Sequence, residues 1–430
     1  MAQAQTQAGP VVVAPDKFKG SLSAAAAAAH IAAGLRRARP RLGVRQVPVA
    51  DGGDGTVAAA IAAGYQPVRL VVGGPTGQPV DAEFAWRNGT AIIEAAQACG
   101  LARLPGGRPE PLTATSFGAG ELIAAAAARG ARRIVLGLGG VASTDGGAGL
   151  VQALGGRLLD RAGHQLPPGG AALAALDRLD LAGLAPLAGI EVLVATDVDN
   201  PLLGSDGAAA VYGPQKGATP ADVAILETGL ARWADHAERA LAGRAREPAD
   251  PRGAEDQRGT EDSRGAADPR GAEHSRRIGR LRDEPGAGAA GGLGFAALAF
   301  LGAPTRPGAE LMLDVISFAD LVAGARLVIT GEGSLDAQTL RGKAPAGVAR
   351  AAASARAGPV VAIAGRCMLS AAQLRDAGIE ACYALADIEP DPDRSMASAG
   401  PLAEEAARRL AADWLPARVP DEPTGAGHEL

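Results

Sequence analysis

The chain has 430 residues, of which 47% are hydrophobic and 21% are charged, and its formal net charge is −5. This length and composition predict a globular protein of two domains with a large core. The mild acidity and 3% aromatic content argue against nucleic-acid binding. Because the three cysteines are widely spaced and we see no basic leader or long apolar span, we expect a cytoplasmic protein without disulfides or a membrane partner.

The first predicted element is a buried strand that opens into a charged loop. Residues 11–13 are β-branched without alternation, and the alanine-rich residues 21–35 favour a helix with Ser21 or Ser23 as N-cap. The loop between them carries Asp16, Lys17, Lys19 and Ser21. Open α/β sheets bind ligands in such loops, although charges of this kind often only solvate a turn.

Further apolar runs end in polar or glycine-rich loops and are mostly followed by segments of helical composition. The predicted strands are RIVLGLGG, EVLVATDVDNP, RLVITGEG and PVVAIAG, whereas AIIEAAQACG does not fit this pattern. Residues 120–130 and 345–357 are predicted to be crossover helices. Alternating strands and helices indicate an α/β fold.

Acidic side chains recur in loops that follow strands. Asp51 and Asp54 lie among glycines in VADGGDGT, and Asp197, Asp199 and Asn200 follow a strand in ATDVDNP. Acids in such loops hold a hard cation or accept a proton. Further polar candidates are Gln215, Lys216, Glu332, Asp336, Gln338, Thr339 and Lys343. The five scattered histidines offer no Ser/His/Asp arrangement, which disfavours a hydrolase of that kind.

A six-residue repeat of arginine and glycine runs through residues 252–277 and contains almost no apolar side chain. Such a segment cannot bury enough surface to offset its ordering entropy, so residues 246–283 are predicted to be a disordered insertion. Residues 1–9 and 416–430 are predicted to be flexible termini.

Two glycine-rich segments match a G-x-G-x-x-G/A pattern. In PGAGAAGG, Gly286, Gly288 and Gly291 have no strand before them, so this segment is predicted to be a loop that faces an anion. In GLGGVASTDGG the pattern does follow a strand, as in nicotinamide-dependent enzymes. However, Asp145 would repel a pyrophosphate there unless a metal or lysine intervened, so a Mg²⁺-bridged phosphate explains this loop better. Close helix–strand packing is the structural alternative for these glycines.

Lysines, acids and glycine-rich loops together are what phosphoryl transfer requires, because the protein must neutralise phosphate charge, hold Mg²⁺ and orient a hydroxyl. The chain has no G-x-x-x-x-G-K-[ST] sequence, which excludes a P-loop kinase. Any kinase of this sequence must belong to another class.

Nine segments, in order, closely resemble the type I glycerate kinase family, from residue 11 to about residue 382. They are APDKFKGSLSA, VADGGDGT, AIIEAAQACGL, TSFGAGELI, GLGGVASTDGGAGLVQALG, TDVDNPLLG, YGPQKGA, PGAGAAGGLGFAAL and LVITGEGSLDAQTLRGKAPAGVA. The resemblance implies ATP-dependent phosphorylation of D-glycerate, typically to 2-phosphoglycerate, in glyoxylate-type carbon metabolism. Two positions depart from the family's common residues: Val141 stands where serine is common, and Ser334 where arginine is frequent.

The resemblance also implies a two-domain α/β fold with the active site in the cleft between the domains. Residues 10–70 together with 285–415 are expected to form a Rossmann/flavodoxin-like parallel-sheet domain. Residues 71–245 are expected to form a second, mixed α/β domain.

The family's motifs, carried onto this chain, suggest site residues as a group. Asp197 would orient or deprotonate the attacking hydroxyl, and Lys19 would pair with the substrate carboxylate. The other substrate-binding candidates are Asp16, Lys17, Ser21, Asn200 and Lys216. The ATP-binding candidates are Gly286, Gly288, Gly291, Gly292, Gly139, Gly140 and Lys343, and the Mg²⁺ candidates are Asp145, Asp51 and Glu332.

Two other functions remain open from the residues alone. A nicotinamide-dependent oxidoreductase acting on a small hydroxy acid would use the glycines from residue 137 onward and should bind NAD(H). A sugar-acid binding module would keep the cleft and turn nothing over. Formation of ADP in the presence of D-glycerate separates both from a kinase.

Overall fold

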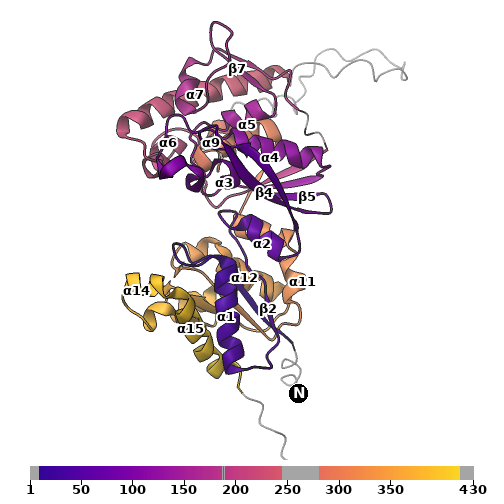
Figure 1. Cartoon of the computed structure of the whole chain (residues 1–430), viewed down its shortest axis with the longest axis vertical. Helices are drawn as coiled ribbons and strands as arrows, with labels where there is room; N and C mark the ends of the chain where they lie inside the picture. Colours follow the sequence, from indigo (N-terminus) through magenta and orange to yellow (C-terminus); the bar gives the residue numbers. More distant parts are fainter. Residues whose placement is uncertain (1–8, 186, 188, 245–279, 417–430) are drawn as a thin grey trace, which may run out of the picture. The chain divides into compact units, whose positions relative to one another are not determined.

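The computed structural model describes residues 9–185, 187, 189–244 and 280–416. Its contacts divide the chain into two compact units (Figure 1). Unit 1 combines the chain up to Val49 with the chain from Leu313 onward, and unit 2 is Ala50–Met312. None of the helices in these described ranges combines the length and apolarity of a membrane span.

Unit 1 is built on a parallel five-stranded sheet of order β15-β13-β11-β1-β2. Its strands are β1 (Val11–Pro15), β2 (Val44–Gln46), β11 (Leu327–Gly331), β13 (Val360–Ala364) and β15 (Ala381–Ala384). A two-stranded parallel ribbon, β12 (Ser334–Leu335) with β14 (Arg366–Cys367), lies beyond the ends of β11 and β13. The helices are α1 (Ala24–Ala38), α11 (Phe318–Val322), α12 (Ala344–Ser354), α13 (Ala371–Asp376), α14 (Pro392–Ala397) and α15 (Ala399–Trp414).

The start of unit 1 follows the sequence prediction. β1 is buried on both faces, and Ser23 caps α1 by accepting a hydrogen bond from the Ala26 N–H at 3.2 Å. α1 and α15 lie side by side, and their alanines and leucines pack with β1, β11 and β13 in one core (Figure 1). Small side chains allow the two helices to approach closely: a Cβ atom on Gly34 of α1 would lie 2.1 Å from the Glu404 carbonyl oxygen of α15.

Unit 2 is built on a mixed six-stranded sheet of order β10-β9-β6-β5-β4-β3. The strands are β3 (Gln66–Gly73), β4 (Pro79–Arg87), β5 (Thr90–Glu94), β6 (Arg133–Gly137), β9 (Glu191–Ala195) and β10 (Thr305–Arg306). The first four strands of that order run parallel to one another. β4 pairs antiparallel with β5, and β3 pairs antiparallel with β4. A separate antiparallel pair is formed by β7 (Arg157–Leu159) and β8 (Arg178–Asp180).

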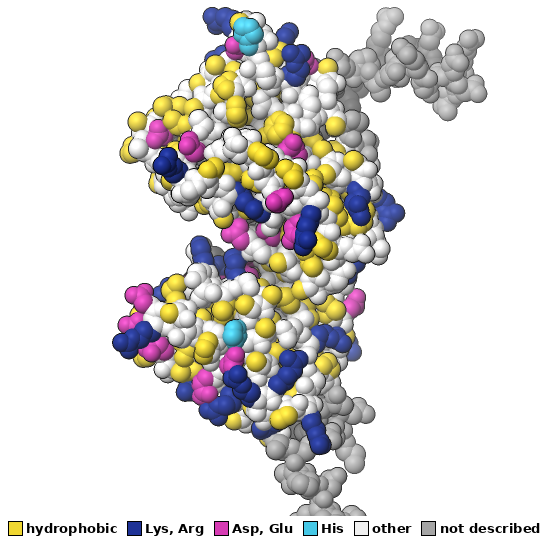
Figure 2. Space-filling view, in the orientation of Figure 1, with side chains coloured by type: hydrophobic (Ala, Val, Ile, Leu, Met, Phe, Trp, Pro, Cys, Tyr) yellow, Lys and Arg dark blue, Asp and Glu magenta, His cyan; other side chains and the backbone are white. Residues whose placement is uncertain are grey.

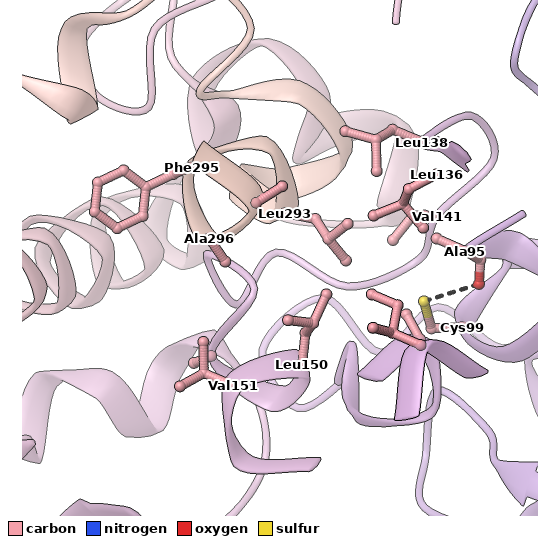
Figure 3. Packing of buried hydrophobic residues seen from close by; sticks show 14 of the residues in the cluster. Ala95, Cys99, Leu136, Leu138, Val141, Leu150, Val151, Leu293, Phe295 and Ala296 are labelled. Carbon is pink, nitrogen blue, oxygen red and sulfur yellow. Dashed lines mark hydrogen bonds between the residues drawn. The ribbon is translucent and has the colours of Figure 1, made fainter. Parts of the chain in front are cut away.

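The helices of unit 2 are α2 (Thr56–Ala62), α3 (Ala96–Cys99), α4 (Phe117–Ala128), α5 (Ala148–Ala153), α6 (Ala208–Tyr212), α7 (Pro220–Arg244) and α9 (Ala289–Leu301). The chain passes from unit 2 into unit 1 within α10 (Gly308–Val315). Leucine, valine and alanine side chains of β6, α5 and α9 share one apolar core, in which the Cys99 thiol donates to the Ala95 carbonyl at 3.1 Å (Figure 3).

Three features differ from the sequence expectations. The run AIIEAAQACG contains a strand after all, because its first residues belong to β5 and only the rest forms α3. Residues 50–70 and 285–312 belong to unit 2, because α2 packs on β4 and β5 while β10 pairs with β9. Most of the predicted insertion, residues 245–279, lies outside the described residues, as do residues 1–8 and 417–430.

The described end of the predicted insertion is ordered and packed. Leu281–Asp283 form a short 3-10 helix, and Leu281 is 8% exposed. The Arg282 guanidinium donates to the Glu238 carboxylate at 2.6 Å and to Asp235 at 2.7 Å, which raises its pKa further. The predicted boundary at residue 283 therefore extends too far toward the C-terminus.

Candidate active site

The loop 51–55 of unit 2 lies across the carboxyl ends of β6 and β9. A Cβ atom on Gly52 would lie 2.7 Å from that of Ala195 at the end of β9, and one on Gly139 would lie 2.5 Å from the Gly53 Cα. Only glycine allows these backbones to approach so closely. The acidic loop and the glycine loop, far apart in the sequence, are therefore adjacent at the sheet edge where open α/β folds bind ligands.

Asp197 follows β9 at this same edge and is solvent-exposed. Its Oδ1 accepts a hydrogen bond from the Gly308 N–H, the first residue of α10, at 2.8 Å. Gly308 also adjoins Asp51, because a Cβ atom on it would lie 1.9 Å from the Asp51 carbonyl oxygen. Asp51 is partly exposed, and its own carboxylate accepts from the Gly53 N–H at 3.0 Å. Asp51 and Asp197, both accessible to solvent, thus both lie next to the Gly308 backbone.

Glu94 is a functional candidate that the sequence analysis did not single out. It ends β5, is 4% exposed, and accepts a hydrogen bond from the Val57 N–H at 2.5 Å, with a further backbone bond from Gly55. Burial raises its pKa, and the nearby charge of Asp54 adds to the effect. Glu94 therefore ties the N-terminus of α2, and with it the loop 51–55, to the central sheet. The sequence feature that could have indicated Glu94 is an acidic residue at the end of the apolar run AIIE.

Asp145 lies in the interior rather than at the surface of the edge, with 1% exposure. Its Oδ2 accepts from the Ser116 N–H at 2.8 Å, the Ser116 hydroxyl at 2.9 Å and the Gly149 N–H at 3.2 Å, and its Oδ1 accepts from the Gly147 N–H at 3.1 Å. A carboxylate with this many donors joins the start of α4 to the start of α5.

Lys216 is also buried, with 3% exposure. Its ammonium donates to the Ser143 carbonyl at 2.6 Å and to the Thr144 hydroxyl at 3.5 Å. Burial lowers its pKa to about 8, although the charge of Asp145 acts in the opposite direction. In this structure the side chain supports the glycine loop 139–147 from within.

Replacing Lys216 with methionine is expected to change how stability depends on pH. The lysine pKa is 10.5 in the unfolded chain and about 8 in the fold, so between these values the unfolded form binds more protons. The free energy of unfolding of the original protein should then rise with pH relative to Lys216→Met, by roughly 3 kcal/mol across the window. Urea titrations at pH 7, 8, 9 and 10 measure the difference. If the difference in free energy of unfolding between the two proteins stays constant from pH 7 to 10, the pKa of Lys216 is not lowered by burial.

Residues 286–292, which include the non-helical start of α9, pack against two loops of unit 2. A Cβ atom on Gly288 would lie 2.2 Å from the Pro201 carbonyl oxygen, and one on Gly291 would lie 2.1 Å from that of Ser143. Gly291 also has φ +70°, and the Gly146 N–H donates to its carbonyl at 3.0 Å. Close packing accounts for these glycines, as it does for the buried Gly286 and Gly292. Gly139 and Gly140, in contrast, are partly or fully exposed.

Asn200 has both ends of its side-chain amide engaged. The Tyr212 hydroxyl donates to its Oδ1 at 2.5 Å, and its Nδ2 donates to the Asp206 carbonyl at 2.7 Å. These bonds hold the loop after β9 against α6. The side chain is only partly buried and borders the loop that carries Asp197.

The edge of the sheet in unit 1 carries the charged loop that follows β1. Asp16 is 5% exposed, accepts from the Lys17 N–H at 2.6 Å and lies 4.0 Å from the Lys17 ammonium. The Ser21 hydroxyl donates to the Phe18 carbonyl at 3.1 Å, which closes the turn. Lys19 extends from this turn into solvent.

A second loop at the same edge of unit 1 follows β11. Glu332 is 8% exposed, accepts from the Thr339 hydroxyl at 2.6 Å and lies 3.8 Å from the ammonium of Lys343, the residue before α12. Ser334, on β12, accepts a hydrogen bond from the Arg366 Nε at 3.0 Å. This edge is therefore rich in basic side chains, whereas over the face of the molecule drawn in Figure 2 basic and acidic side chains are interspersed.

A family model described as the glycerate kinase family matches residues 11–415. The chain belongs to the glycerate kinase family. It is 40% identical over 406 residues to a glycerate kinase of Bacillus subtilis (strain 168), which covers 94% of this chain and 97% of that protein. It is 39% identical over 379 residues to a glycerate 2-kinase of Escherichia coli (strain K12), which covers 87% and 90% respectively.

A crystal structure of a protein described as glycerate kinase 2, from Salmonella typhimurium LT2, has the same fold. It matches with a TM-score of 0.72 and 37% identity, covering 94% of this chain and 99% of that one. The expected α/β fold and glycerate kinase family are thus confirmed. The sites assigned to individual residues stay predictions.

The glycerate kinase fold brings some of the predicted residues together within a unit. In unit 2, Asp51 and Asp197 adjoin Gly308, and Gly139 lies against the same acidic loop. In unit 1, the loops of Lys19 and Glu332 adjoin, because a Cβ atom on Gly333 would lie 3.2 Å from the Lys19 nitrogen. Asp145, Lys216 and the glycines at 286, 288, 291 and 292 are instead engaged in internal packing.

The three predicted Mg²⁺ ligands differ in how well they suit a metal. Within the described ranges, no three His, Cys, Asp or Glu side chains form a group that could hold an ion. Asp145 is enclosed by five N–H or O–H donors, and Glu332 is buried against Thr339 and Lys343. Asp51 remains partly exposed. Because Mg²⁺ is usually held by one or two carboxylates together with substrate phosphates, Asp51 fits that chemistry.

Proposed function

We propose that this protein transfers the γ-phosphoryl group of ATP to the 2-hydroxyl of D-glycerate and releases ADP and 2-phosphoglycerate. The observation that carries the proposal is an accessible acid at the carboxyl end of β9, Asp197, in a chain that aligns over 87% of its length with a glycerate 2-kinase. The hydroxyl oxygen attacks phosphorus, the bond to the β,γ-bridging oxygen breaks, and the hydroxyl proton leaves to a base.

Asp197 is the proposed base. One carboxylate oxygen accepts a hydrogen bond from the Gly308 N–H, which orients the side chain, and the carboxylate would receive the proton of the substrate hydroxyl. Asp199, two residues later, is also exposed, but among the described residues no backbone N–H donates to its carboxylate. The anchored geometry favours Asp197.

The phosphate groups are proposed to lie over the exposed glycines 139 and 140, where backbone atoms can approach an anion. Asp51 would hold Mg²⁺, and the ion when bound supplies positive charge to the phosphate oxygens. Lys343, which precedes α12, is proposed to add a further positive charge for the nucleotide. The glycines before and within the start of α9 would act indirectly. Gly286 and Gly288 would shape the loop 198–201, and Gly291 and Gly292 would shape the loop 143–146, against which they pack.

Lys19 is proposed to bind the glycerate carboxylate, with Asp16, Lys17 and Ser21 shaping its loop. Lys19→Ala should raise KM for D-glycerate about 10–100-fold with little change in kcat, because the carboxylate is charged in both the ground and the transition state. Steady-state kinetics in each substrate measure this. Arg375→Ala is the control, because Arg375 is an exposed cation of α13 in the same unit to which no role is assigned. An unchanged KM for D-glycerate in Lys19→Ala contradicts the assignment.

The proposed function is tested by ADP formation with the full chain, ATP and Mg²⁺. ADP release should depend on D-glycerate and be far slower with L-glycerate or no acceptor. NADH formation from D-glycerate and NAD⁺ is measured in parallel. ADP release that is independent of D-glycerate, or NADH formation in its place, contradicts the proposal.

A further inference from the structure

Arg366 lies at the carboxyl edge of the parallel sheet of unit 1, on a strand to which no role has yet been given. β14 follows β13 along the chain and pairs in parallel with β12, which follows β11. Ser334 is the register partner of Arg366 in this ribbon. Ligands of open α/β sheets bind at this edge, so an arginine here is placed to contact one.

The position of Arg366 is fixed by its neighbours. The backbone N–H of Arg366 donates to the Gly333 carbonyl at 3.2 Å, and the backbone N–H of Gly365 donates to the Glu332 carbonyl at 3.2 Å. The two backbones are so close that a Cβ atom on Gly365 would lie 2.4 Å from the Gly333 oxygen. The side chain donates from Nε to the Ser334 hydroxyl at 3.0 Å. One side of the guanidinium is thus oriented, while its two terminal amino groups remain for a ligand.

The charges at this edge are unevenly paired. Two basic side chains face acids, namely Lys17 with Asp16 at 4.0 Å and Lys343 with Glu332 at 3.8 Å. Lys19 and Arg366 are both exposed, and among the described residues neither forms an ion pair. Their loops adjoin through Gly333. Two unpaired cations on adjoining, closely packed loops favour a bound anion over any other ligand.

We propose that Arg366 and Lys19 together bind the carboxylate of glycerate. The planar guanidinium can donate two parallel hydrogen bonds to this group, and the ammonium adds a second positive charge. This inference rests on the proposed function and adds a binding residue to it. Ser334 acts as the positioning residue for Arg366.

The test compares four variants of the full chain: Arg366→Ala, Arg366→Lys, the exchange Ser334→Arg with Arg366→Ser, and Arg375→Ala. Arg375 is an exposed arginine of α13 in the same unit and serves as the control. Kinetics in each substrate give both KM values. The rise in Tm caused by ATP, D-glycerate or pyrophosphate gives binding without turnover, and circular dichroism confirms folding.

Arg366→Ala should raise KM for D-glycerate about 10–100-fold and reduce the Tm shift caused by D-glycerate, and Arg366→Lys should have a smaller effect. A change confined to ATP and pyrophosphate would overturn the carboxylate assignment. The exchange variant places the arginine at position 334, on the paired strand, and the serine at position 366, and should recover much of the loss. Should the original protein not phosphorylate D-glycerate, the proposed function fails while the Tm shifts still test Arg366. Wild-type KM values and Tm shifts in Arg366→Ala would overturn the inference.

Discussion

Asp197→Asn is expected to lower kcat by about 10²–10⁴-fold while changing both KM values by less than about threefold. The amide keeps the size of the side chain and can still accept from the Gly308 N–H through its oxygen. It loses the negative charge that receives the hydroxyl proton in the transition state. Steady-state kinetics, with circular dichroism to confirm folding, measure the effect.

Asp199→Asn is the matched control for this prediction. Asp199 lies in the same loop and is also exposed, so its replacement removes the same charge from the same region. If general electrostatics were responsible, both variants would lose activity alike. Near-normal turnover in Asp197→Asn, or an equal loss in both variants, rules out Asp197 as the base.

Gly291→Ala should cost about 2–4 kcal/mol of unfolding free energy. The added Cβ atom would lie 2.1 Å from the Ser143 carbonyl and 2.8 Å from the Lys216 ammonium, at a residue with φ +70°. The loop 143–147 and the turn into α9 would have to separate. Urea denaturation measures the loss.

Gly302→Ala is the control that separates the cost of a steric clash from the cost of a left-handed backbone conformation. Gly302 ends α9 with φ +60°, and no atom lies within 4 Å of the position of its Cβ. Its replacement should cost only the left-handed backbone penalty of about 1–2 kcal/mol. Equal losses in the two variants show that Gly291 is not packed as described.

The sequence predicted the strands that are buried on both faces. β1, β6, β9, β11 and β13 are short β-branched runs that each end in a polar or glycine-rich loop. β3 and β4 were missed, because each exposes part of one face and mixes polar with apolar residues. The domain boundaries were also displaced, since α2 and β10 are assigned by their packing partners, which local composition does not reveal.

The sequence predicted where several exposed candidate residues lie, although their roles stay predictions. Asp51, Asp197, Lys19 and Lys343 lie at the carboxyl edges of their sheets, as expected for loops that follow parallel strands. The sequence could not distinguish these from polar residues that close the interior. Asp145 and Lys216 have the same composition signal, yet their partners are backbone groups brought near by folding. Glu94 was overlooked because its partners are also backbone groups, of Val57 and Gly55, that only folding brings near.

Phosphorus NMR of the reaction product is the most direct test of the proposed reaction. The full chain is incubated with ATP, Mg²⁺ and D-glycerate, and the resonances are compared with authentic 2-phosphoglycerate and 3-phosphoglycerate. We expect ADP and 2-phosphoglycerate in equal amounts, with Asp197→Asn giving the same product far more slowly. Formation of 3-phosphoglycerate as the first product, or ADP with no phosphoglycerate, would contradict transfer to the 2-hydroxyl.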